Sequence, residues 1–135
     1  MSDLGWLDVP SEPRRADAAE AARLRAAAEG RGWRCVRIQG SAARDKDSLL
    51  EAFAKVVPLP DYFGRNWDAL EECLREPDIL GKGPGCLIEV SDFPLVERGL
   101  GAEAPAFLSL MTDLSAQWSR ETPPFAFKVL LVNEL

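Results

Sequence analysis

The chain has 135 residues, with 16 basic and 22 acidic side chains and a formal net charge of −6. This length suits one domain that buries a core of its own without disulfides or metal ions. The acidic balance argues against nucleic acid as a partner, because nucleic-acid binding requires clustered Lys and Arg side chains, and it suits a basic protein partner.

The N-terminal part of the chain combines short apolar stretches with one Ala-rich stretch. Leu4–Val9 is short and apolar, and it predicts either a strand or a packed arm in which Trp6 and Leu7 are buried on the rest of the protein. Arg14–Gly30 is rich in Ala, Glu and Arg and predicts a surface helix. Trp33–Gly40 alternates well enough to be a strand, so this part should add an edge strand to a parallel sheet.

Amphipathic helices and apolar strands alternate through the rest of the chain. Asp47–Val57 and Trp67–Arg75 have apolar residues at helical spacing, and a loop is expected from Pro77 to Gly85. The later elements are expected to be a strand over Cys86–Val90, a helical turn over Leu95–Gly99, a helix over Pro105–Ser119 and a strand over Phe125–Val132.

This order of elements predicts an α/β domain with a small parallel sheet packed with helices. The sheet should have three strands, or four if the N-terminal part contributes one. The sheet is expected to include Cys35–Ile38, Cys86–Val90 and Lys128–Leu131. Beneath the helix that begins at Trp67, the buried side chains should be Trp67, Leu70 and Leu74.

Several classes of site are disfavoured by composition. The chain contains no histidine, which removes the usual general base and the commonest metal ligand. Cys35, Cys73 and Cys86 form no CxxC pair and lie in apolar patterns, so they are predicted to be reduced core residues. We therefore expect no catalytic residue, no metal site and no cofactor.

No segment resembles an apolar signal sequence or a membrane span, since Met1 leads directly into polar and acidic residues. We therefore expect a cytoplasmic protein that does not bind membranes and is a monomer when free.

The helix predicted from Trp67 carries acids on the side opposite its apolar face. Asp68, Glu71 and Glu72 point away from the stripe that buries the helix. Asp68 and Glu72 are four residues apart, and a like-charge pair at this spacing costs a helix about 0.2–0.5 kcal/mol. The acids are either an ordinary solvated surface or charges retained for a partner.

The residues just before this helix have the composition of a binding surface. The only tyrosine of the chain, Tyr62, stands beside Phe63 and Gly64. An aromatic side chain next to acids is typical of protein interfaces. Asn66 is a good N-cap, so the start of the helix should be fixed.

The run from Leu59 to Leu74 resembles the signature of the barstar family, the inhibitors of barnase-type ribonucleases. In that signature a Leu-Pro-acid-aromatic-aromatic-Gly-x-Asn turn leads into an x-Asp-Ala-Leu helix that ends in Cys-Leu. Weaker similarity extends to Gly85–Phe93 and to Phe127–Leu131. The resemblance implies a barstar-like domain over residues 33–135, with residues 1–32 as an N-terminal extension packed on it.

The resemblance implies a function and a site as well as a fold. Barstar-like proteins plug the active site of a basic ribonuclease with the signature helix and the loop before it. Tyr62 would pack on the nuclease, and Asp68 would pair with its cations. Glu72 stands where the family has its principal aspartate, which mimics a substrate phosphate, and Asp113 matches a further contact residue on the late helix.

Two departures from the family pattern bear on the partner. Glu71 stands where barstar has a tryptophan, and Glu72 keeps the charge of the family aspartate on a longer arm. Since binding energy depends on fit more than on formal charge, we expect the partner to be a related basic ribonuclease or another toxin.

Two other functions remain open. One is an interaction module of the same fold whose acidic face binds a basic protein that is not a nuclease. The other is a small enzyme with Asp68 and Glu72 as an acid/base pair, which would require an environment that separates their pKa values.

Overall fold

The computed structural model describes residues 3–60, 64, 66–80 and 83–134, with the side chains of residues 3 and 4 left out. In chain order, the elements of this part are η1 (Asp3–Asp8), β1 (Arg14–Ala16), α1 (Ala18–Gly30), β2 (Arg34–Gln39), η2 (Gly40–Ala42), α2 (Lys46–Val56), α3 (Trp67–Leu74), α4 (Pro77–Leu80), β3 (Gly85–Ser91), α5 (Phe93–Leu100), η3 (Gly101–Glu103), α6 (Ala104–Ser119) and β4 (Ala126–Val132). The η elements are 3-10 helices.

The sheet has four parallel strands in the order β1-β4-β3-β2. Its register places Cys86 of β3 between Arg34 of β2 and Phe127 of β4. Every residue of β3 is buried, as expected for a central parallel strand covered on both faces. The prediction of an α/β fold with a parallel sheet is therefore confirmed, and so is the presence in it of the three predicted segments, of which Cys35–Ile38 lies in the edge strand β2.

The predicted boundaries in the N-terminal part are wrong in two places. Of the two alternatives for Leu4–Val9, the strand is wrong, because Asp3–Asp8 forms a 3-10 helix, and the packed arm agrees with the burial of Leu7 and the packing of Trp6 against the same core. The edge strand is instead Arg14–Ala16. These residues were predicted to belong to the helix that follows. The helix begins at Ala18 because the side chain of Asp17 accepts a hydrogen bond from the Glu20 backbone N–H at 2.7 Å, which caps its first turn.

Two later boundaries also differ from the prediction. The expected loop after Pro77 begins with the one-turn helix α4, in which proline at the first helical position is favourable and Leu80 is buried. The expected turn at Leu95–Gly99 is the complete helix α5, which starts at Phe93.

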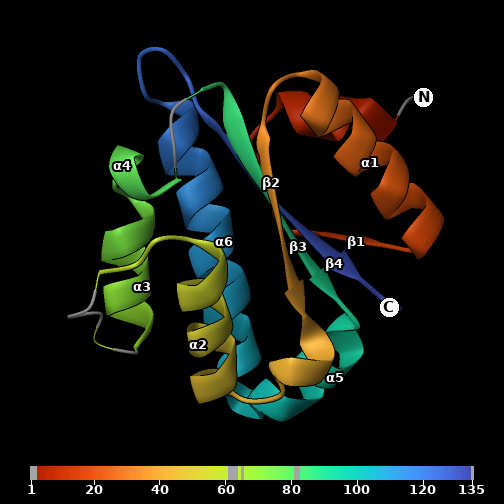
Figure 1. Cartoon of the computed structure of the whole chain (residues 1–135), viewed down its shortest axis with the longest axis vertical. Coiled ribbons are helices and arrows are strands. Elements are labelled where there is room, and N and C mark those ends of the chain that lie inside the picture. The colour runs from red at the N-terminus through yellow and green to blue at the C-terminus, as the bar shows by residue number, and fades with distance from the viewer. Residues whose placement is uncertain (1–2, 61–63, 65, 81–82, 135) are drawn as a thin grey trace.

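Helices cover the two faces of the sheet in separate layers. Figure 1 shows α2, α3 and α6 on one side of the strands and α1 on the other. The larger core lies beneath the first layer and the smaller one beneath α1, where Leu7 and Leu24 pack with Leu87 and Leu130 of the sheet. The N-terminal residues thus share a core with the strands, and Leu7 is only 2% exposed.

None of the helices in the described part of the chain is both long and apolar enough to cross a membrane.

Candidate functional site

The start of α3 is fixed by the side chain of Asn66. Its Oδ1 accepts a hydrogen bond from the backbone N–H of Ala69 at 2.8 Å, and its Nδ2 donates to the carbonyl of Gly64 at 2.9 Å. One side chain therefore caps the helix and ties the preceding turn to it. Asn66 and Gly64 are both exposed, so this turn lies on the surface next to the acids of α3.

Two indole groups anchor the ends of α3 to the body of the protein. At the first turn, the Trp67 ring lies 5.9 Å from that of Phe107 on α6, and its Nε1 donates to Glu103 Oε2 at 3.4 Å. At the last turn, the buried Trp118 Nε1 donates to the carbonyl of Leu74 at 2.9 Å. The helix is held at both ends, so its outer side chains are displayed on a fixed backbone.

The prediction of a buried apolar face on α3 is confirmed for Leu70 and Leu74, which are fully buried. Trp67 is only half-buried, because its ring lies at the edge of the core. Lys46 of α2 covers the ring there, with its Nζ 5.7 Å from the ring centroid.

The three acids of α3 differ in what they contact. Glu71 is half-buried and pairs with Arg75 one turn later, with Oε2 and Nη2 2.9 Å apart. Asp68 and Glu72 are exposed, and neither pairs with a basic side chain among the described residues. Two carboxylates are thus available to an incoming cation, while the third is already neutralised by its neighbour.

A hollow of about 660 Å³ lies beside Glu72. Its wall is formed by α3, α4 and the segment before α3, through Pro58, Pro60, Glu72, Cys73, Glu76, Asp78 and Ile79. Burial raises the pKa of the Cys73 thiol, and the charges of Glu72 and Glu76 raise it further. The negative charge of the helix therefore continues past its C-terminal end into this hollow.

Glu76 and Asp78 did not stand out in the sequence as site residues. The helical spacing of Glu72 and Glu76 is visible in the sequence. That Glu76 lies around one hollow with Pro58 and Pro60 is visible only in the fold.

The remaining predicted site residues are placed as follows. Asp113 is exposed on α6, which packs along α3. Gln117, one turn after it, lines a second hollow together with Arg75. Tyr62 and Phe63 lie outside the described residues.

The geometry of the acidic face suits binding better than chemistry. Asp68 and Glu72 are both exposed to solvent on one helix, so both carboxylates are open to an incoming partner. Within the described part of the chain, no group of three or more Cys, Asp or Glu side chains is arranged to hold a metal ion.

Most of the chain matches the model of a known protein family. A family model described as barstar, the barnase inhibitor, matches residues 33–130. The matched region begins just after α1 and contains the whole acidic helix, whereas η1, β1 and α1 lie before it. A search of curated proteins finds no significant match.

Proposed function

Because the chain belongs to the barstar family, we propose that it is a protein inhibitor that occupies the active site of a basic ribonuclease or related toxin. The binding surface in this proposal is the acidic face of α3 with the turn before it. Its residues are Tyr62, Phe63, Gly64, Asn66, Asp68, Glu71, Glu72 and Asp113.

The main support for this function comes from the exposure of Asp68 and Glu72 and from their lack of a cationic partner among the described residues. Both carboxylates are exposed and unpaired among the described residues, yet their helix is fixed at both ends. Because these unpaired charges stand on a fixed helix, the inhibitor loses little conformational entropy when a partner binds.

A ribonuclease active site supplies a matching surface. Such a site presents cationic side chains to the phosphates of RNA, and a carboxylate can take the place of a phosphate oxygen in a charge-assisted hydrogen bond. The inhibitor then blocks access to RNA without performing chemistry, so inhibition is stoichiometric and reversible. The net charge of −6 also speeds encounter with a basic partner.

The environment of Glu71 and Glu72 supports a partner other than barnase. Glu71 stands at a position where the family carries tryptophan, and it is engaged with Arg75. It is therefore a weak contact at the edge of the surface. Glu72 reaches further than the family aspartate and borders the hollow that contains Glu76, so its partner cation is expected to lie toward α4.

The test is a double charge reversal, Asp68→Lys with Glu72→Lys. It should weaken inhibition of the cognate ribonuclease by at least about 30-fold, because removing one partner of a desolvated charge pair costs about 2–5 kcal/mol. Both side chains are exposed, so the thermal midpoint should stay close to that of the wild type.

A matched control reverses two exposed acids of the N-terminal part, Glu12→Lys with Glu29→Lys, which changes the net charge equally. The control should inhibit as the wild type does. Equal loss in both variants would show that only the total charge matters. Capture of a cationic protein without nuclease activity, with no ribonuclease inhibited, would favour the interaction module.

A further inference from the structure

A second site lies where the N-terminal part meets the sheet, away from α3. β1 pairs with β4 only over Leu130–Val132, because its first residue, Arg14, stands opposite Leu130. The chain before β1 passes the earlier residues of β4 instead. Between them lies a pocket of about 220 Å³, and its lining includes Asp8 and Val9 from this segment and Trp33, Phe127 and Lys128 from the sheet region.

Lys128 is a buried cation without a counter-ion in this pocket. The residue is only 3% exposed. Its Nζ donates to the Val9 carbonyl and to Ser11 Oγ, the latter at 3.1 Å, and lies 5.2 Å from the centroid of the Trp6 ring. No carboxylate of the described residues lies within ion-pair distance of Lys128, and burial lowers its pKa to about 8 although Asp8 acts in the opposite direction.

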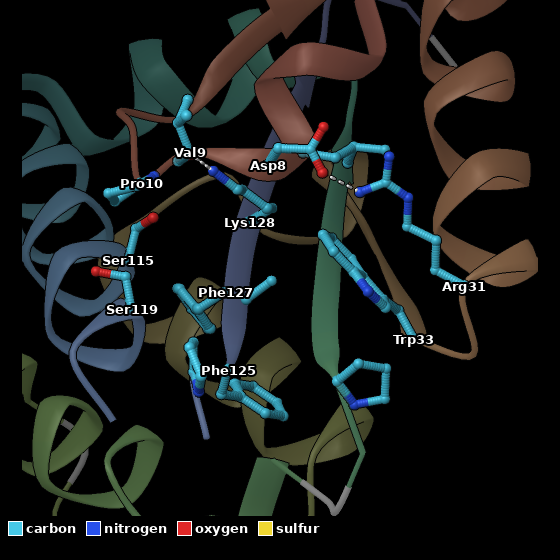
Figure 2. A pocket seen from close by; sticks show the side chains of 14 residues that line it. Asp8, Val9, Pro10, Arg31, Trp33, Ser115, Ser119, Phe125, Phe127 and Lys128 are labelled. Carbon is cyan, nitrogen blue, oxygen red and sulfur yellow. Dashed lines mark hydrogen bonds and ion pairs between the residues drawn. The ribbon is translucent and has the colours of Figure 1, made fainter. Parts of the chain in front are cut away.

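The only acid that lines the pocket is already neutralised. Asp8 pairs with Arg31, whose Nη1 lies 2.6 Å from Asp8 Oδ1. Figure 2 shows this pair on one side of Lys128, with Ser115 and Ser119 of α6 on the other. Among the described side chains that line the pocket, none therefore pairs with the charge of Lys128, and a buried unpaired charge is unfavourable unless an anion accompanies it.

The rest of the wall is partly aromatic. Trp33 lines the pocket from the core beneath α1, whereas Phe125 and Phe127 line it from the larger core on the other face of the sheet. An aromatic side chain on the wall suits a flat apolar body, and few polar groups then orient the ligand. A dry cavity of about 150 Å³ accommodates benzene, so the volume here suffices for one ring with a carboxylate.

We propose that this pocket binds a small aromatic carboxylate, with the carboxylate against the Lys128 ammonium and the ring against Trp33. The site is built jointly by the N-terminal segment and the family domain. It shares no lining residue with the hollow beside Glu72, although Ser115 and Ser119 come from α6, which lies in the same layer as α3 (Figure 1). Ligand binding here would hold the N-terminal segment on β4.

The test is a titration of the full chain followed by NMR, with benzoate as the probe and benzyl alcohol and acetate as its uncharged and ring-free counterparts. Benzoate should bind with a Kd of about 1 mM or tighter and shift the Trp33 indole and Phe127 amide signals. Benzyl alcohol and acetate should each bind at least about tenfold more weakly, because each lacks one half of the interaction.

Two variants and one control separate this site from general binding. Lys128→Met should weaken benzoate binding at least about tenfold, whereas Lys55→Met, which removes an exposed lysine of α2, should leave it unchanged. Ser119→Leu fills the pocket from its half-exposed rim and should abolish binding even if the Lys128 variant does not fold. Absence of benzoate binding, equal binding of benzyl alcohol, or unchanged binding in Ser119→Leu would overturn the proposal.

Discussion

At the scale of single residues, the most informative contacts are those that hold α3 rather than those that face outward. Asn66 was expected to cap the helix, and its two hydrogen bonds join the cap to the turn. The role of Trp118 could not be predicted from the sequence, because it depends on a helix more than forty residues away in the chain meeting the Leu74 carbonyl.

Replacing Asn66 by alanine should lower the free energy of unfolding by about 1 kcal/mol, since the first turn of α3 loses its side-chain cap. Urea denaturation measures this loss. Asn66→Asp retains an acceptor for the Ala69 N–H and should be less destabilising. Asn133→Ala, at an exposed asparagine outside any helix, is the control and should change little. Equal stability of the alanine variants would contradict the role of the cap.

Glu89 on β3 is a buried carboxylate whose charge is compensated from two elements. Its oxygens lie 2.5 Å from Arg25 Nη1 of α1 and 3.3 Å from Arg37 Nε of β2. Arg25→Ala should therefore destabilise the protein by about 1–3 kcal/mol, because the buried carboxylate keeps only the exposed Arg37 as a partner. Arg120→Ala, at an exposed position after α6, should have a small effect in the same denaturation assay. An equal effect of the two variants would show that Arg25 contributes no more than a surface charge.

The contribution of Cys86 to stability can be tested by changing the pH. Burial raises the pKa of its thiol to about 12, against about 9 for an ordinary cysteine. Since the unfolded thiol loses its proton first, its contribution to stability should be constant below pH 9 and decline as the pH rises from about 9 toward 12. Cys86→Ala should show a shallower decline than the wild type in unfolding measured across this range. Equal declines of stability with pH in the wild type and in Cys86→Ala would show that Cys86 does not cause the decline.

At the scale of elements, the sequence predicted those helices and strands whose apolar residues recur with a regular period. The strands at Cys86–Val90 and Phe125–Val132 and the helices at Asp47–Val57 and Pro105–Ser119 were all placed within a few residues of their structural bounds. β1 was missed because Arg14–Ala16 has no apolar alternation. Its strand conformation comes from backbone pairing with β4, which no local pattern records.

For the acidic face, too, some features could be predicted from the sequence and others depend on the fold. The separation of apolar and acidic sides on α3 followed from helical spacing, and the exposure of Asp68 and Glu72 agrees with it. The pairing of Glu71 and the hollow beyond Glu72 required the fold, because they depend on rotamers and on the prolines that lie across from α4.

The N-terminal elements should contribute to stability without contributing to inhibition. Leu24 of α1 is fully buried, so Leu24→Ala should cost about 2–5 kcal/mol in unfolding experiments. Leu108→Ala, at a half-exposed leucine of α6, should cost less. Neither variant should change inhibition of the partner, since neither side chain belongs to the proposed surface. Weakened inhibition by folded Leu24→Ala would connect α1 to the site.

At the scale of the whole molecule, the two layers over the sheet have different proposed roles. The layer with α2, α3 and α6 carries the acidic face, and the layer with α1 and η1 covers the other side of the sheet (Figure 1). The excess of acids over bases should act at long range on a basic partner. Raising the salt concentration should therefore slow association much more than dissociation, because exposed charges are screened over about 10 Å at 0.1 M ionic strength. Stopped-flow kinetics of the complex measures both rates, and a salt-independent association rate would contradict electrostatic steering.

The central claim is that the acidic face of α3 is the surface that meets the partner. Its most direct test is hydrogen exchange of the full chain, free and in complex with the partner captured from its own cells. Complex formation should slow exchange in Gly64–Glu76, while the amides of α1 should exchange as in the free protein. Slowed exchange over α1 and β1, with α3 unchanged, would contradict it.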